Sequence, residues 1–242
     1  MPAIANHTTT VFDADLCAVR SEVAAMGALV RQSAMAAVTA LRRRDFDLAR
    51  QQIELDREID LFQRRIETKA IETIARRQPF AVDLRELVSA FRIVNELERI
   101  GDLAKSICKR VILMDAAPRS DLVQAIQRVS RPVLRQLADV LESYAKRDAA
   151  QAVSVWSSDQ EIDAAHASLL RELLTHMVED PRNIVAGAHL LFCSKNLERM
   201  GDHTTNIAES VHYLVRGERL NSDRPKGDDL NAFDTSLLGY PA

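Results

Sequence analysis

The chain has 242 residues, enough for one large domain or two modest domains, each with a buried core. Hydrophobic residues make up 47% of the chain but aromatic residues only 5%, a composition that favours long helices over sheets. The 32 basic and 35 acidic residues are interspersed and leave a net charge of −3. We therefore expect a helical protein without a basic face for nucleic acid.

The cysteines and the N-terminal residues bear on the cellular compartment. Cys17, Cys108 and Cys193 are far apart and outside any CxxC or Cys/His spacing, which predicts reduced core thiols. The first residues lack a charged start followed by an apolar core, and no apolar run approaches the roughly 18 residues of a membrane span. We expect a cytoplasmic protein with no direct membrane insertion.

Three helices are expected in the first half of the chain. Apolar periodicity predicts a helix over residues 12–44. Asp45 is then a suitable N-cap for a second helix over residues 46–77, which Pro79 ends. A third helix is expected over residues 82–115.

The second half of the chain repeats this order. A fourth helix is expected over residues 121–146, and Asp148 is the N-cap of a fifth helix that reaches about residue 178. A sixth helix covers residues 182–216, and Gly217 is placed to cap its end.

Acidic residues recur between the halves at nearly constant spacing. The matched pairs are Asp45 and Asp148, Asp56 and Asp159, Asp60 and Asp163, shifted by 103 (for example 148 − 45), and Glu98 and Glu198, Asp102 and Asp202, shifted by 100 (for example 198 − 98). The sequence therefore predicts an all-α protein of two tandem three-helix bundles, with six long helices from an internal duplication. The bundles, residues 12–117 and 119–217, could stack end to end or side by side, and residues 218–242 form a mobile polar tail.

The repeated acids form pairs four residues apart, so both members of a pair share one helical face. If the second and third helices of a unit pair antiparallel, four carboxylates converge, and the glycine of LERIGD or LERMGD suggests that another backbone approaches closely. Oxygen-only clusters suit hard cations such as Mg²⁺, Mn²⁺, Ca²⁺ or ferric iron, although structural salt bridges would repeat as well. The candidate ligands are Asp56, Asp60, Glu98 and Asp102 in the first unit and Asp159, Asp163, Glu198 and Asp202 in the second.

These motifs resemble the PhoU family: LERIGD and LERMGD, the continuation HTTNIAE, and the upstream D-x-E-I-D pairs. The resemblance implies a cytoplasmic, non-enzymatic accessory of the phosphate ABC transporter and a negative regulator of phosphate-starvation genes. It implies two partners, the transporter's ATPase subunit and a sensor histidine kinase, and a homodimer. It also implies that the paired acids can hold multinuclear iron or another cation, with Mg, Mn and Zn not excluded and no metal required for catalysis.

The two acidic faces continue differently. After Asp202 the face reaches Asn206, which we add to the candidate metal ligands, whereas after Asp102 it reaches Lys109, which disfavours a metal at the first site. His203 lies about 100° round the helix and is expected to be a surface or interhelical histidine.

The alternative is a helical-bundle protein that binds metal through bridging carboxylates. It would be either a metal store or, as an enzyme, a di-iron oxidase. Di-iron sites of this kind need Glu-x-x-His on two helices. Here Glu209-x-x-His212 occurs once, and Asp163-x-x-His166 lacks the Glu. A seat for phosphate is not visible, because neither a Gly-rich loop nor a GK[ST] motif is present. We therefore predict a non-enzymatic regulatory adaptor.

Overall fold

The structure is a computed structural model, which describes the backbone of residues 3–114 and 120–220 and the side chains of residues 13–114, 122–158 and 160–220. Its elements are α1 (Ala3–Arg43), α2 (Phe46–Arg77), α3 (Ala81–Leu113), α4 (Ser120–Lys146), α5 (Ala149–Ser157), α6 (Asp159–Glu179), a 3₁₀ turn (Pro181–Asn183) and α7 (Ile184–Arg216). Over these described ranges the chain contains no strand. The predicted all-α fold is confirmed, and most of the expected tail, 221–242, lies outside the described residues.

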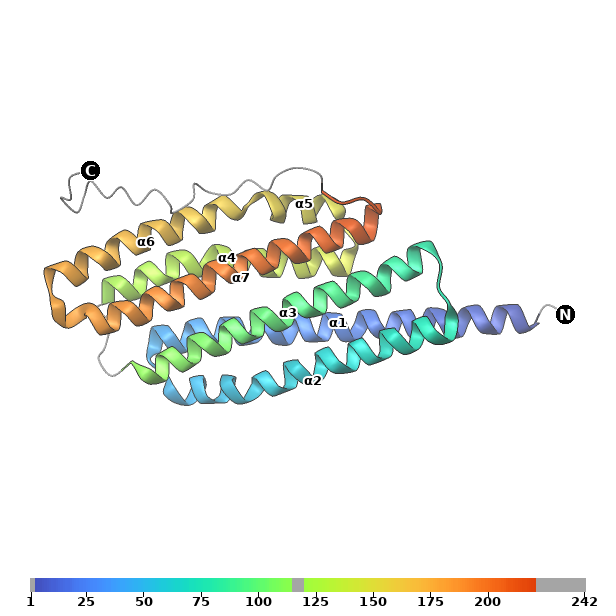
Figure 1. Ribbon diagram of the computed structural model, residues 1–242, viewed down its shortest axis with the longest axis horizontal. Coiled ribbons are helices and arrows are strands. Elements are labelled where there is room, and N and C mark those ends of the chain that lie inside the picture. The colour runs from blue at the N-terminus through green and yellow to red at the C-terminus, as the bar shows by residue number, and fades with distance from the viewer. Residues whose placement is uncertain (1–2, 115–119, 221–242) are drawn as a thin grey trace, which may run out of the picture.

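The two three-helix units lie side by side, not end to end. Helices α1, α2 and α3 form the first unit, and α4, the α5–α6 pair and α7 form the second (Figure 1). Helix α3 runs antiparallel to α7 and packs against it more extensively than any other pair of helices, while α1 runs antiparallel to α4. The third helix of each unit is therefore central to the whole molecule.

The predicted helix ends are confirmed at three positions. The Asp45 carboxylate accepts a hydrogen bond from the backbone N–H of Leu48 at 2.9 Å, and Asp148 accepts one from Ala150 at 2.9 Å. Both residues therefore act as N-caps that satisfy free donors of the first helical turn. Gly217 ends α7 with a φ of 79°, a left-handed conformation that glycine adopts without steric cost.

The helices differ from the prediction by more than two residues at two places. The expected fifth helix is broken at Ser158 into α5 and α6, because the Ser158 hydroxyl donates to the carbonyl of Val155 and accepts a hydrogen bond from Gln136, both at 2.8 Å. Helix α1 begins at Ala3 and not near Phe12, because the prediction took the first residue of the apolar stripe as the start and the helix continues through the mostly polar residues before it.

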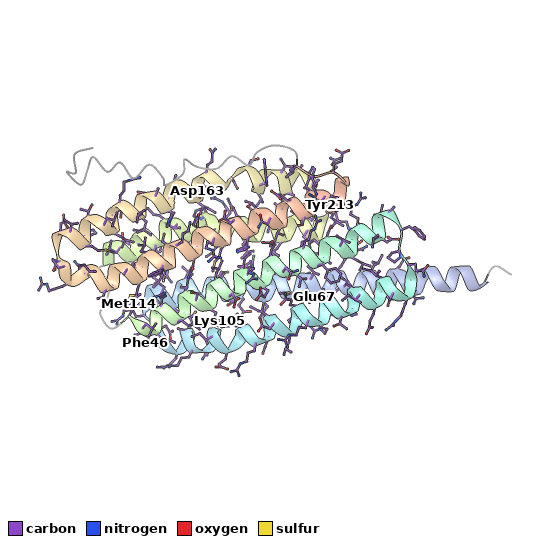
Figure 2. The ribbon with its side chains drawn as sticks, in the orientation of Figure 1. Phe46, Glu67, Lys105, Met114, Asp163 and Tyr213 are labelled. Carbon is purple, nitrogen blue, oxygen red and sulfur yellow. The ribbon has the colours of Figure 1, made fainter. Side chains whose placement is uncertain are left out.

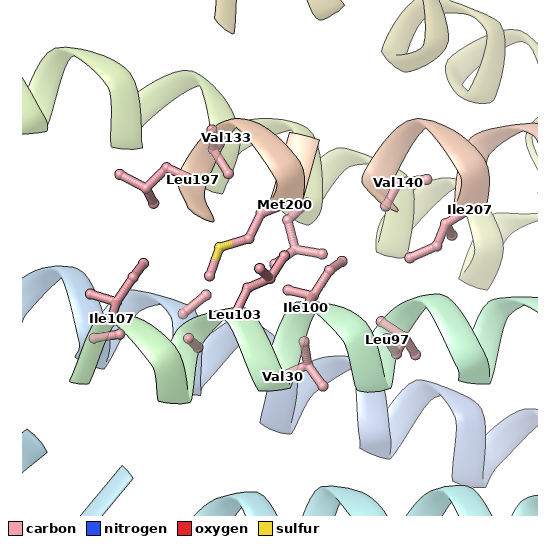
Figure 3. Close-up of a cluster of buried hydrophobic side chains, with 14 of the residues drawn as sticks. Val30, Leu97, Ile100, Leu103, Ile107, Val133, Val140, Leu197, Met200 and Ile207 are labelled. Carbon is pink, nitrogen blue, oxygen red and sulfur yellow. The ribbon is translucent and has the colours of Figure 1, made fainter. Parts of the chain in front are cut away.

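One continuous hydrophobic core extends through both units. Figure 3 shows side chains of α3 and α7 meeting each other and those of α1 and α4. Residues at this junction have 1% or less of their surface exposed: Val30, Leu97, Ile100, Val133, Val140, Leu197, Met200 and Ile207. The two repeats therefore share a core, and neither buries its third helix alone.

Helix α1 is the chain's one candidate membrane span among the described residues. By length and composition alone, the segment Asp13–Arg43 is apolar enough to cross a membrane, contrary to the expectation that no apolar run approaches that length. Half of the most apolar window is buried against the rest of the protein, as in the core helix of a bundle.

The cysteines divide into two groups. Cys108 and Cys193 are buried, and burial raises the pKa of each thiol to about 12, so both remain neutral core side chains. The prediction of a core position is wrong for Cys17, which is exposed. Its neighbour Leu16 takes the inward position on α1 and leaves Cys17 on the outer face.

A buried carboxylate connects the two units. Glu86 on α3 is 3% exposed and accepts hydrogen bonds from Arg20 of α1, at 2.8 Å from Nη2, and from Arg147 in the turn after α4. Burial alone would raise the pKa of Glu86, but the two arginines outweigh it and hold the pKa below its ordinary value. The ionised form of Glu86 therefore stabilises the packing of the units.

Replacement of the buried acid, Glu86→Gln, should lower the free energy of unfolding at pH 7 by about 3 kcal/mol, since two guanidinium groups lose their anion. Because the pKa of Glu86 is lower in the folded state, its contribution is present above the unfolded-state pKa and is lost as pH falls through the folded-state pKa. Urea unfolding of wild type and variant across this range should show the stability difference shrinking in acid.

The control for that experiment is Glu72→Gln, which breaks an exposed ion pair with Arg76. Exposed pairs contribute little, so the control should change the free energy of unfolding by less than about 1 kcal/mol. A Glu86→Gln protein as stable as the control at pH 7 would show that the buried ion pair does not hold the units together.

Candidate functional site

The four predicted acids of the first unit come together between α2 and α3. Asp56 is 3% exposed, and its pKa is raised by burial and further by the nearby charges of Asp102 and Asp60. Burial likewise raises the pKa of Glu98, and Asp102 and Asp60 add to the effect. The arrangement is a partly buried cluster of like charges that needs a cation to be stable.

That cation is present in the chain itself. The ammonium group of Lys105 hydrogen-bonds the carboxylate of Asp56 and lies 3.5 Å from Oδ1 of Asp102. The hydrogen bond to Asp56 raises the pKa of Lys105, so the side chain is a permanent cation at neutral pH. Figure 2 labels Lys105 on α3, the helix that faces α2. The sequence hypothesis named Lys109 as the opposing charge, but Lys109 is exposed one turn further on.

Gly101 lets the two helices approach at this cluster. A Cβ atom on Gly101 would lie 2.9 Å from Cδ1 and 3.3 Å from Cγ2 of Ile59, which is closer than carbon atoms normally approach. A close contact at the glycine of LERIGD is therefore present in the first unit, but the group that approaches is the Ile59 side chain and not the backbone that the sequence suggested.

The second unit has a similar cluster with a different lysine. Burial raises the pKa of Glu198, and the charges of Asp202 and Asp163 add to this effect. Lys195 lies 2.8 Å from the Glu198 carboxylate oxygens and hydrogen-bonds one of them, Oε1, while the buried Oε2 makes no hydrogen bond. The side chain of Asp159, the fourth predicted ligand, lies outside the described residues.

Asn206 faces the other unit. Its amide nitrogen donates to Oε2 of Glu96 on α3 at 3.0 Å, and His203 Nδ1 lies 2.7 Å from the same oxygen. His203 is thus an interhelical histidine, as expected. This polar contact bridges α7 and α3 and does not join Asn206 to the acids of its own unit.

The histidines of the di-iron alternative contact groups other than the acids. His166 is buried with its Nδ1 2.7 Å from the Ser194 hydroxyl, and His212 lies 3.1 Å from the carbonyl of Glu218. Glu209 accepts a hydrogen bond from the Trp156 indole at 3.0 Å. Among all the side chains that the structure describes, no three His, Cys, Asp or Glu are placed to hold a metal ion.

The two units differ in whether their side chains leave room for a metal ion. In the first unit the donor set does not fit a metal, because Lys105 already occupies the space between Asp56 and Asp102. In the second unit the hypothesis remains a prediction, since it depends on Asp159.

A polar cavity between α3 and α7 was not predicted from the sequence. It has a volume of about 600 Å³, and its lining residues are Arg92, Asn95, Glu96, Asn206, Glu209, Ser210, Tyr213, Arg219 and Leu220. The Arg92 guanidinium lies 5.4 Å from the centre of the Tyr213 ring, and at the opposite end of the same helix pair Arg110 lies 4.2 Å from the Phe192 ring. Only the pairing of the two units brings these residues together, so periodicity within one helix could not reveal them.

The fold and the acid clusters define a duplicated helical-bundle protein with one lysine-neutralised acidic cluster in each repeat. Comparison with known proteins gives the family. The sequence profile of the PhoU domain matches residues 23–111 and 126–211, and the chain belongs to the PhoU family.

Its relatives cover almost the whole chain. It is 46% identical to the phosphate-specific transport system accessory protein PhoU homolog of Caulobacter vibrioides, over 93% of this chain and 98% of that one. It is 34% identical to the phosphate-specific transport system accessory protein PhoU of Escherichia coli K12, over 93% of this chain and 92% of that one. The crystal structure of PhoU from Pseudomonas aeruginosa superimposes with a TM-score of 0.80 at 40% identity, covering 86% of this chain and all of that chain.

Gly101→Ala tests the close approach of α2 and α3. On an exposed helix this change would raise the free energy of unfolding by about 1 kcal/mol. Here the new methyl group meets Ile59, and such overpacking costs about 1–3 kcal/mol. We expect a net loss of about 1 kcal/mol in urea unfolding.

Ile59→Val supplies the matched control, because it deletes the Cδ1 atom that the new methyl group would meet. Alone it should cost about 1 kcal/mol, and the double variant should be no less stable than Ile59→Val alone. Strictly additive losses in this double-mutant cycle would show that Gly101 is not needed for the helix contact.

Proposed function

We propose that this chain is a non-enzymatic accessory protein of phosphate-specific transport that represses the phosphate-starvation response. In this proposal it works in the cytoplasm, as a homodimer, and links the ATPase subunit of the phosphate ABC transporter to a sensor histidine kinase. The observation that carries the proposal is the extent of the similarity: relatives named as accessory proteins of this transport system match both repeats along nearly their whole length.

The shape of the molecule supports a linking role. The α2–α3 turn and the α6–α7 turn lie at opposite ends of the bundle (Figure 1). Each end presents large apolar side chains to solvent: Phe80 is 83% exposed at one end and Val178 is 84% exposed at the other. Apolar groups of this kind gain stabilisation when a partner covers them. Two separated ends would let one molecule contact two partners at once.

The direct test uses the full-length chain with an affinity tag, expressed in phosphate-rich cells that lack the untagged gene. We expect the transporter ATPase subunit and the sensor kinase to co-purify, and a phosphate-starvation promoter to remain silent. Loss of the gene should activate that promoter at high phosphate. Capture of neither partner, together with a promoter that stays silent without the gene, would refute the adaptor proposal.

Substitutions at the two ends sharpen this test. Phe80→Ser and Val178→Ser should leave the melting temperature nearly unchanged, because both side chains already face water. Each should reduce co-purification of one partner by roughly tenfold, as expected when a buried interface anchor is removed. Leu61→Ser, a 60% exposed position in the middle of α2, is the matched control and should retain both partners. Equal capture by all three variants would show that the ends are not the contact surfaces.

A second proposal concerns metal at the second cluster, where the buried Oε2 of Glu198 lacks a hydrogen bond. Lys195, whose ammonium lies 2.8 Å from Oε2, is 51% exposed and can turn into water, and iron or another hard cation, such as Mg²⁺ or Mn²⁺, would then take its place beside this oxygen. Elemental analysis of protein purified without chelator should find metal that is lost in Glu198→Gln. The repeat-equivalent change Glu98→Gln should leave the metal content unchanged. Absence of metal from folded wild type would exclude this proposal.

A further inference from the structure

The first acidic cluster already contains a cation in the position where it is needed. The Lys105 ammonium contacts the acids of both helices, because it hydrogen-bonds Asp56 on α2 and lies 3.5 Å from Asp102 on its own helix. Asp56 is almost fully buried, so its carboxylate depends on this contact for compensation of its charge.

We propose that Lys105 fills the cation position of the first acidic cluster and thereby excludes metal ions from that repeat. The first LERIGD unit is then a structural charge cluster with a tethered ammonium group. A metal ion could bind there only after the ammonium group had been displaced.

The physical argument compares a tethered and a free cation. An ammonium group has three hydrogen-bond donors and no free coordination position, so it satisfies carboxylates without sharing them. A divalent ion that entered would lie next to Lys105 at a separation where like charges repel strongly in a partly buried site. Moving Lys105 away would also break its charge-assisted hydrogen bond with Asp56. Both effects favour the lysine over a metal.

Two other cations of α3 close to the cluster in sequence are less well placed for this role. Arg99 is 63% exposed and lies 3.6 Å from Glu98 at the rim of the cluster, and Lys109 is exposed one turn beyond it. The assignment is therefore specific to Lys105.

The second repeat has no lysine at the position equivalent to Lys105. The residue equivalent to Lys105 is Thr205 (205 − 100 = 105), which is buried and donates its hydroxyl to the backbone carbonyl of Asp202 at 2.8 Å. Its cluster is balanced by Lys195, which is 51% exposed and lies at the outer edge. An exposed lysine can swing into water, whereas the side chain of Lys105 is only 27% exposed.

The test is a titration of chelator-treated, full-length protein with Mn²⁺, followed by the EPR signal of free Mn²⁺. The proteins compared are wild type, Asp56→Asn, Lys105→Ala, Lys105→Ala with Asp56→Asn, and Lys109→Ala. We expect Lys105→Ala to bind one more Mn²⁺ per chain than wild type, and Asp56→Asn to cancel this gain. Asp56→Asn alone and Lys109→Ala should bind as wild type does.

Two outcomes would overturn the proposal. One is Mn²⁺ bound by wild type that Asp56→Asn removes, because the first cluster would then take metal beside Lys105. The other is a folded Lys105→Ala protein that binds no more Mn²⁺ than wild type. Lys105→Gln, which keeps a neutral hydrogen-bond donor, replaces the alanine variant if circular dichroism shows that the latter is unfolded. Melting curves give an independent readout, since Mn²⁺ should raise the Tm of Lys105→Ala by more than it raises that of wild type.

Discussion

The packing of α3 against α7 is the constraint on which the rest of the structure depends. Both helices are apolar on more than one side, so two neighbours within a unit cannot cover them. Leu97 and Ile100 of α3 are fully buried in the shared core together with Ile207 of α7 (Figure 3). Each such side chain contributes about 2 kcal/mol when it leaves water. An end-to-end arrangement would expose much of this surface, which explains why the units lie side by side.

Polar groups along this junction fix how the two helices align. Asn196 donates to the Ser106 hydroxyl at 3.1 Å, and about three turns away along α3 His203 and Asn206 contact Glu96. Apolar side chains alone tolerate small shifts along a helix, whereas hydrogen bonds between buried or half-buried groups are lost if the helices slide by one turn. The core thus supplies most of the stability, and the polar contacts select one alignment.

Much of the fold follows from local signals in the sequence. Asp45 and Asp148 are N-caps because an aspartate before an apolar-periodic run can bond the free N–H groups of the first turn. Gly217 ends α7 because only glycine adopts its left-handed backbone without strain. The repeat of LERIGD and LERMGD likewise implies equivalent helices in the two halves. These signals depend on a few neighbouring residues and do not require a particular tertiary packing.

Features that depend on contacts between helices could not be predicted in the same way. The break at Ser158 needs Gln136 of α4 to hold the serine hydroxyl. The choice of Lys105 over Lys109 depends on which turn of α3 faces Asp56, and both lysines fit the helical period of the acidic face. The sequence therefore predicted that the acids of the first unit lie close together, but it did not identify Lys105 as their partner, and the metal stays a prediction.

The two repeats neutralise their clustered acids with lysines at different positions. Each copy places like charges on a partly buried face, beside Gly101 in the first unit and Gly201 in the second. The first copy recruits a lysine three residues after its aspartate, and the second recruits one three residues before its glutamate. If the acids served only to pair with a lysine, a single pairing position within the repeat would have been enough. The acids are common to both copies, whereas the neutralising lysine stands at a different position in each. The shared feature of the repeats is therefore the acidic cluster, and the position of its lysine distinguishes one repeat from the other.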